Sequence, residues 1–175
     1  MNSAHLHLIL NHLPIIGTAF VAAFLAAAIY YRNAEFQRLS FAAFIFLALV
    51  TIAVYFSGEG AEEIVERLPG VSHDLIEGHE GSGLMVFIGM EVLGVGALAG
   101  LVMFRKAAQI PRNLALGVLA LSLVCLLLAS WAALLGGKIR HPEAHGAAIG
   151  VEAEPGGEEE DESGRRRRRG RGREE

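Results

Sequence analysis

The 175-residue sequence contains only one cysteine, Cys125. A disulfide within the chain, a multi-cysteine zinc site, an iron–sulfur cluster and covalent Cys-x-x-Cys-His haem attachment are therefore excluded within it. Charged residues are also scarce, at 19% of the chain, whereas 53% of the residues are hydrophobic. The hydrophobic residues stand in long runs and not at the intervals of an amphipathic helix or strand. This composition is atypical of a soluble domain and predicts a membrane protein.

Four hydrophobic runs are long enough to cross a bilayer, because a helix of about 20 residues covers ~30 Å of hydrocarbon. Three of them, residues 13–31, 39–58 and 114–137, contain no charged side chain. The fourth, residues 81–104, contains Glu91, whose insertion in the ionised form would cost about 3 kcal/mol. The first run lacks the basic start and small-residue end of a cleavable signal peptide, so we expect it to remain in the protein. The predicted fold is all-α, a membrane-embedded up-down four-helix bundle.

The domain organisation follows from the change in composition near residue 145. Residues 1–145 form the predicted transmembrane helical domain. Residues 146–175 are rich in Gly, Glu and Arg, so we expect a disordered charged tail, not a nucleic-acid site.

The segment between the second and third spans is expected to have structure of its own. Residues 61–68 combine apolar side chains with a row of glutamates, which predicts a short periplasmic amphipathic helix on the membrane surface. Pro69-Gly70 would stop that helix. Ser72 then predicts the start of another helix, which continues without a break into the third span.

The charges of the short loops predict the direction of the helices. Residues 32–38 and 105–112 contain only one acid, Glu35, and five bases. The bases are Arg32, Arg38, Arg105, Lys106 and Arg112. By the positive-inside rule we place these loops in the cytoplasm and both termini on the exterior side of the membrane.

All seven histidines lie on the side predicted to be exterior. They are His5, His7, His12, His73, His79, His141 and His145. They come from three segments, before the first span, before the third and after the fourth, which an antiparallel bundle brings to one end. A helix starting near Ser3 would place His5 and His12 on one face, and Pro14 would kink its entry into the membrane.

A b-type haem is the first hypothesis for this histidine cluster. Haem iron takes two axial imidazoles, and His12 and His79 lie at matching depths on diagonal helices. Gly17, Gly81 and Gly83 would leave room for the macrocycle. Arg140 or Lys138 would pair with the propionates. Such a haem would receive electrons from quinol and pass them to a periplasmic carrier.

Two alternatives remain open from the residues. One is a transition-metal site without haem, because imidazole and carboxylate ligands suit zinc, copper, nickel or iron. Its candidate ligands are His5, His7, His12, His79, Glu80, His141 and His145. The sequence has no His-Glu-x-x-His motif, so metal-dependent hydrolysis is not expected. The other alternative is a cofactor-free accessory subunit that docks protein partners.

Glu91 is a separate candidate, because a carboxyl group in the middle of a span usually faces the bundle interior and serves a function. A structural hydrogen bond to Ser122 or Thr51 is the alternative interpretation.

Four motifs carry a resemblance to known sequences. They are the Asn-His-x-Pro opening at residues 11–14, the acidic segment 58–63, the pair His79-Glu80 and the Gly-Gly-Lys-Ile-Arg-His-Pro-Glu ending at residues 136–143. Over residues 5–145 the chain resembles a group of uncharacterised bacterial four-helix membrane proteins with no agreed activity. The resemblance implies a bacterial inner membrane and a respiratory or redox setting. By the same resemblance, the functional positions are His12, Pro14, Glu59, His79, Glu80, His141 and Glu143.

Overall fold

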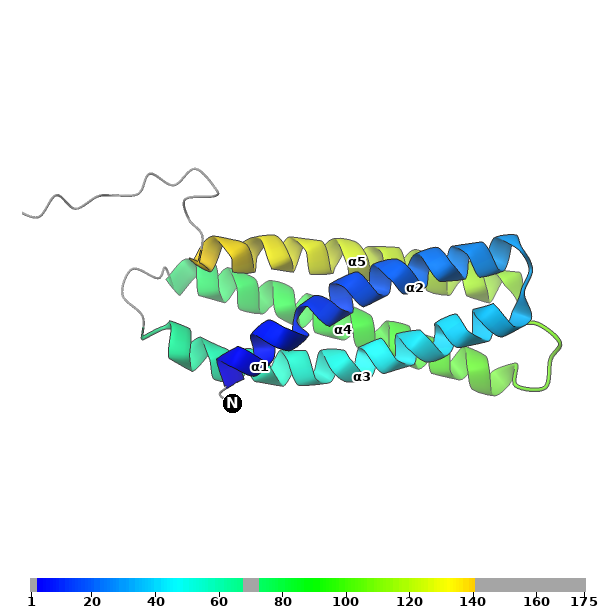
Figure 1. Ribbon diagram of the computed structural model, residues 1–175, viewed down its shortest axis with the longest axis horizontal. Helices are drawn as coiled ribbons and strands as arrows, with labels where there is room; N and C mark the ends of the chain where they lie inside the picture. Colours follow the sequence, from blue (N-terminus) through cyan, green and yellow to red (C-terminus); the bar gives the residue numbers. More distant parts are fainter. Residues whose placement is uncertain (1–2, 68–72, 141–175) are drawn as a thin grey trace, which may run out of the picture.

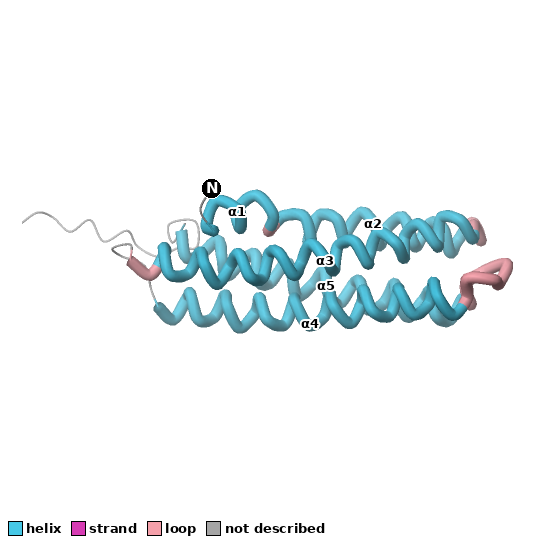
Figure 2. Tube along the Cα trace, turned by 90° about the horizontal axis from the view of Figure 1, so that it is seen from below, coloured by secondary structure: helices cyan, strands magenta, loops and turns pink. Residues whose placement is uncertain are grey.

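The computed structural model describes residues 3–67 and 73–140, and every regular element in these ranges is a helix (Figure 1). The elements are α1 (Ser3–Leu10), α2 (His12–Tyr30), α3 (Ala34–Val65), α4 (His73–Met103) and α5 (Arg112–Arg140). The four long helices lie side by side along one axis, and α1 packs mainly against α3 (Figures 1 and 2). We call the end of the helices where α1 lies the α1 end.

Four helical segments of the described chain are long and apolar enough to cross a membrane. They are Ser3–Tyr30, Ala34–Val65, His73–Met103 and Arg112–Ile139. Each matches one of the four predicted spans, so the prediction of an all-helical chain with four such segments is confirmed. Large apolar side chains such as Phe20, Leu49, Val95 and Leu127 are exposed on the outside of the helices, as a hydrocarbon solvent would require.

The predicted separate amphipathic helix at residues 61–68 is wrong for the part that is described. Residues 61–65 are the last residues of α3, which runs without a break from Ala34. Gly58 and Gly60 do not interrupt α3, because α1 packs directly against their backbone. An added Cβ on Gly58 would lie 3.2 Å from the His7 ring, and one on Gly60 would lie 2.6 Å from Ser3 Oγ. The predicted unbroken entry into the third span is confirmed, since α4 continues from His73 to Met103.

The break between α1 and α2 lies at Asn11, three residues before Pro14. The Asn11 N–H still donates to the His7 carbonyl at 2.9 Å. Pro14 has no N–H for the Leu10 carbonyl, so the helical ladder is interrupted there. The predicted helix before the first span, described from Ser3 onward, and the predicted kink near Pro14 are confirmed.

Along the seam between α3 and α4, the backbone of α4 approaches α3 closely at two glycines, Gly94 and Gly100. An added Cβ on Gly94 would lie 2.5 Å from Ala48 Cβ. Farther along, Phe87 stacks on Tyr55 with ring centroids 4.7 Å apart. From the first contact to the second, the residue number rises by seven on α3 and falls by seven on α4. The two helices are therefore antiparallel, with the same register at both contacts.

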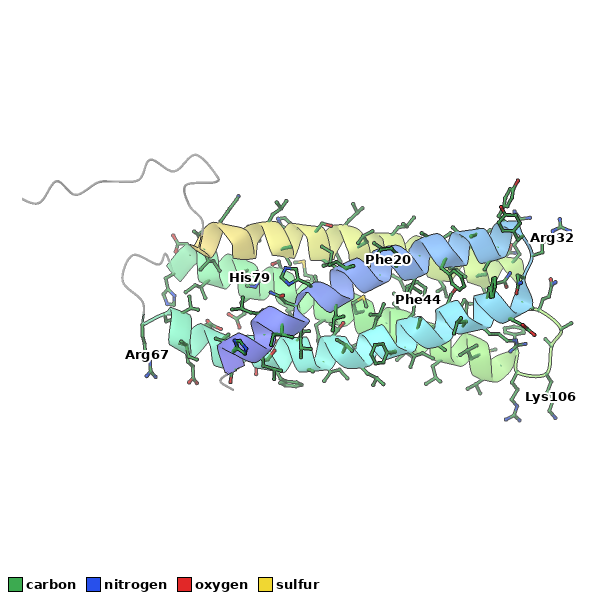
Figure 3. All side chains as sticks on the ribbon, in the orientation of Figure 1. Phe20, Arg32, Phe44, Arg67, His79 and Lys106 are labelled. Atoms are coloured by element: carbon green, nitrogen blue, oxygen red, sulfur yellow. The ribbon has the colours of Figure 1, made fainter. Side chains whose placement is uncertain are left out.

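At the opposite end, hydrogen bonds link the first turns of α3 with the α4–α5 loop. Arg38 Nη2 donates to the carbonyls of Phe104 at 2.9 Å and Ala107 at 2.8 Å. Figure 3 shows Arg32 and Lys106 together at this end, whereas Arg67 lies at the α1 end. The basic loops that predict the membrane direction therefore meet at one end of the molecule.

Candidate cofactor site at the α1 end

His7 is the inward-facing histidine of α1 and is half-buried against α3. Its Nδ1 lies 3.0 Å from the Val54 carbonyl oxygen and 3.4 Å from Ser57 Oγ. A carbonyl oxygen only accepts hydrogen bonds, so Nδ1 carries the hydrogen in this contact. In the neutral ring Nε2 then keeps its lone pair, which is the state that a metal requires.

His79 on α4 is held in the same way by another helix. Its Nδ1 lies 3.0 Å from the carbonyl oxygen of Ala132 on α5, so this ring also keeps the Nε2 lone pair when neutral. In Figure 3 the His79 side chain lies between α5 and the point where α1 meets α2. Two imidazoles from different helices are therefore fixed by backbone carbonyls.

The imidazole rings of His7 and His79 are in contact with each other. Their centroids are 6.4 Å apart and their planes are at 84°. Glycines provide the space for both rings: an added Cβ would lie 3.2 Å from His7 Cε1 at Gly58 and 2.9 Å from His79 Cε1 at Gly136. Each ring thus lies against a glycine of the helix that also supplies its carbonyl acceptor.

Near the pair lie a part-exposed glycine and an unpaired polar atom. Gly83, one turn beyond His79 on the same face, has nothing within 4 Å of an added Cβ. Asn11 follows His7 by one turn, and its Oδ1 is buried without a hydrogen-bond partner. Lys138 is half-buried, two residues after Gly136 on α5.

The expected pairing of His12 with His79 differs from the ring contact that the structure shows. His12 lies exposed at the start of α2, and His79 meets His7 instead. The reason is the break at Asn11, which turns α1 toward α3. His7 and Asn11 then share the inner face with the buried residues Pro14 and Thr18, while His12 points away from it.

The other predicted site residues are more scattered. His5 and Glu80 are exposed, and His73 Nδ1 lies 3.5 Å from a Glu66 carboxylate oxygen. His141, Glu143, His145 and the side chain of Arg140 lie outside the described residues. Of the glycines expected to leave room for a macrocycle, Gly81 and Gly83 adjoin open space, whereas Leu47 fills the space at Gly17. Gly17 therefore leaves no space for a macrocycle.

Within residues 3–67 and 73–140, no group of three or more His, Cys, Asp or Glu side chains is arranged to hold a metal ion. The described site consists instead of two imidazoles. The sequence reasoning missed the pairing of His7 with His79 and the glycines beneath the rings. The signal that favours His7 is its spacing from Asn11, Pro14 and Thr18, which together follow one helical face.

Comparison of the chain with known protein families, with curated proteins and with solved structures finds no match. The resemblance to uncharacterised bacterial four-helix membrane proteins therefore stays a prediction. The function must be argued from the two imidazoles and their surroundings.

Proposed function

We propose that this chain is a bacterial inner-membrane protein, an up-down four-helix bundle that binds b-type haem through His7 and His79. The α1 end would face the periplasm, so both termini would be periplasmic. The protein would act as an electron-transfer or accessory subunit of a redox complex, with quinol as the electron donor and a periplasmic carrier as the acceptor.

The His7–His79 pair carries this proposal. With bonds of about 2 Å, a metal bound by both rings would hold their centres roughly 6 Å apart, and the centroids of His7 and His79 are 6.4 Å apart. Histidines that bind metals usually donate their second ring N–H to a carbonyl or carboxylate, as both Nδ1 atoms do. Two imidazoles satisfy haem iron because the porphyrin supplies the other four nitrogens.

The chain's own residues would hold and orient the group. His7 and His79 would hold it through their Nε2 atoms, and the Val54 and Ala132 carbonyls would fix both rings. Lys138, a half-buried residue of α5, would supply an ammonium group suited to a propionate. Bound haem would supply a centre that accepts and releases one electron.

A transition metal without haem is the alternative that the same pair favours, because neutral imidazole also suits copper and zinc. Such an ion needs further donors, which would come from His141, His145 or a bound molecule. A subunit without a cofactor would instead leave the two rings as a polar packing contact.

The test is a reduced-minus-oxidised visible spectrum with metal analysis on the same detergent-purified full-length protein. We expect the α-band of b-type haem and about one equivalent of iron. His7→Ala should abolish the band, and His12→Ala, an exposed position five residues away, should leave it intact. A blank spectrum with stoichiometric metal would favour the metal site. A protein without colour or metal would overturn both cofactor proposals.

A further inference from the structure

Titratable side chains lie at intervals along the seam between α3 and α4, from Glu62 and Glu80 at the α1 end through Tyr55 to Glu91. The constant antiparallel register, which pairs Ala48 with Gly94 and Tyr55 with Phe87, also places Thr51 opposite Glu91. Toward the α1 end, the same register places Glu62 of α3 close to α4, where its carboxylate interacts electrostatically with Glu80. The seam therefore connects the acidic α1 end with a carboxyl group in the middle of a helix that is apolar enough to cross a membrane.

Glu91 has an unsatisfied oxygen. Its Oε1 is buried and has no hydrogen-bond partner. The two hydroxyl groups expected to bind it are already used, since Thr51 donates to the Leu47 carbonyl at 2.8 Å and Ser122 donates to the Leu119 carbonyl at 2.7 Å. The Thr51 oxygen still has acceptor capacity. The setting therefore suits a protonated carboxyl group better than a carboxylate.

The described parts of the neighbouring helices that pack beside Glu91 contain no charged residue that could neutralise it. Where α2 meets α4, Thr18 Oγ1 contacts Met90 Sδ at 3.6 Å, and where α5 meets α4, Cys125 lies against Gly89. Residues 13–31 and 114–137, which form most of these two helices, contain no charged residue. An ionised carboxylate without a counter-charge is costly in a hydrocarbon environment, so neutrality at Glu91 requires a proton.

Tyr55 occupies the seam between Glu91 and the acidic α1 end. Its ring stacks on Phe87, one helical turn from Glu91 along α4, at 4.7 Å and 26°. Beyond it, Glu59, Glu66 and His73 surround Glu62 electrostatically. The hydroxyl group of Tyr55 can both donate and accept hydrogen bonds. Ser57 and Ser82, the buried hydroxyls nearby, donate to backbone carbonyls of their own helices.

We propose that Glu91 is a proton-binding site that exchanges its proton with the α1 end along the α3–α4 seam by way of Tyr55. In loading, hydronium at the acidic end gives a proton to the Tyr55 hydroxyl group and leaves water, while that hydroxyl group passes its own proton to Glu91. An O–H bond forms at Glu91, and the carboxylate becomes neutral. Unloading reverses this step, and no electron is transferred. The proposal goes beyond the haem function and does not depend on it.

Infrared spectroscopy of the full-length protein in lipid nanodiscs tests the proton site. We expect the C=O stretching band of a protonated carboxyl group, which shifts in D2O and is lost in Glu91→Gln. Glu91→Asp should move the band instead of removing it, and so serves where the glutamine variant fails to fold. Glu63→Gln, at an exposed position of α3, should leave the band unchanged. A band that Glu91→Gln and Glu91→Asp do not alter would overturn the proposal.

The rate of the D2O shift tests the route. Tyr55→Phe keeps the ring stacked on Phe87 but removes the hydroxyl group, and we expect it to slow the shift about tenfold or more with the band intensity unchanged. Tyr30→Phe changes an exposed tyrosine at the opposite end. In this variant the Glu91 carboxyl group should exchange its proton at the wild-type rate. Equal rates in the two variants would refute the route through Tyr55. The band reports the carboxyl group whether or not haem is bound, so failure of the haem proposal would be seen separately.

Discussion

His7 and His79 stand at right angles with ring centroids 6.4 Å apart, although 72 positions separate them in the chain. The contact depends on two further features, a break in the helix one turn after His7 and a glycine against each ring. The break at Asn11 turns α1 onto α3, and Gly58 and Gly136 leave the space that the rings occupy. A rigid pair of imidazoles of this kind suits a cofactor, because ligands that are already oriented need little reorganisation on binding.

Gly136→Ala should displace the His79 ring. The added methyl group would lie 2.9 Å from His79 Cε1, so the ring must move and its hydrogen bond to the Ala132 carbonyl must lengthen. We expect a loss of about 1–3 kcal/mol of stability from overpacking, together with loss of the haem α-band. Chemical unfolding in detergent and the reduced-minus-oxidised spectrum measure these effects.

Gly117→Ala is the matched control for that change, because it lies on the same helix and an added Cβ there meets nothing within 4 Å. It should keep the band and be stabilised by up to ~1 kcal/mol through helix propensity. If Gly136→Ala and Gly117→Ala behave alike, the glycine beneath His79 has no role in holding the ring.

The existence of the four long helices was predictable because hydrophobic runs of about 20 residues have few alternatives in a membrane. Their ends were less predictable. The absence of charge limited the second run to residues 39–58, whereas α3 extends from Ala34 to Val65. Asn33 caps its start by accepting a hydrogen bond from Phe36 N–H at 3.0 Å. Beyond the predicted run, α3 continues because α1 packs on its glycines.

The candidate site was predictable only in part. The histidine-rich end could be anticipated, and His79 was among the expected ligands. The spacing of His7 from Asn11, Pro14 and Thr18 places it on the inner face, but Pro14 predicts only that the helix is interrupted and not the direction in which α1 turns. That direction is decided by packing on Gly58 and Gly60, which are 50 residues or so away in sequence and carry no side-chain pattern of their own.

Gly94→Ala should force α3 and α4 apart. The added Cβ would lie 2.5 Å from Ala48 Cβ, and a methyl group cannot rotate away as a longer side chain can. We expect a destabilisation of about 1–3 kcal/mol, measured by unfolding in mixed detergent micelles. Gly96→Ala, whose added Cβ meets nothing within 4 Å, is the control. Adding Ala48→Gly to Gly94→Ala should restore the stability, and a double variant as unstable as Gly94→Ala would show that the clash is not the cause.

The direction of the helices in the membrane is tested by thiol labelling from outside the cell. The native thiol, Cys125, is buried and is removed as Cys125→Ala. Single cysteines are then placed at two exposed positions, Glu63→Cys at the α1 end and Ala107→Cys in the α4–α5 loop. Because the loop carries the bases Arg105 and Lys106, which favour retention in the cytoplasm, a membrane-impermeant maleimide should label Glu63→Cys in intact spheroplasts. It should label Ala107→Cys only after lysis. The reverse pattern would place His7 and His79 on the cytoplasmic side, and the electron acceptor of the proposed haem would then have to be a cytoplasmic protein and not a periplasmic carrier.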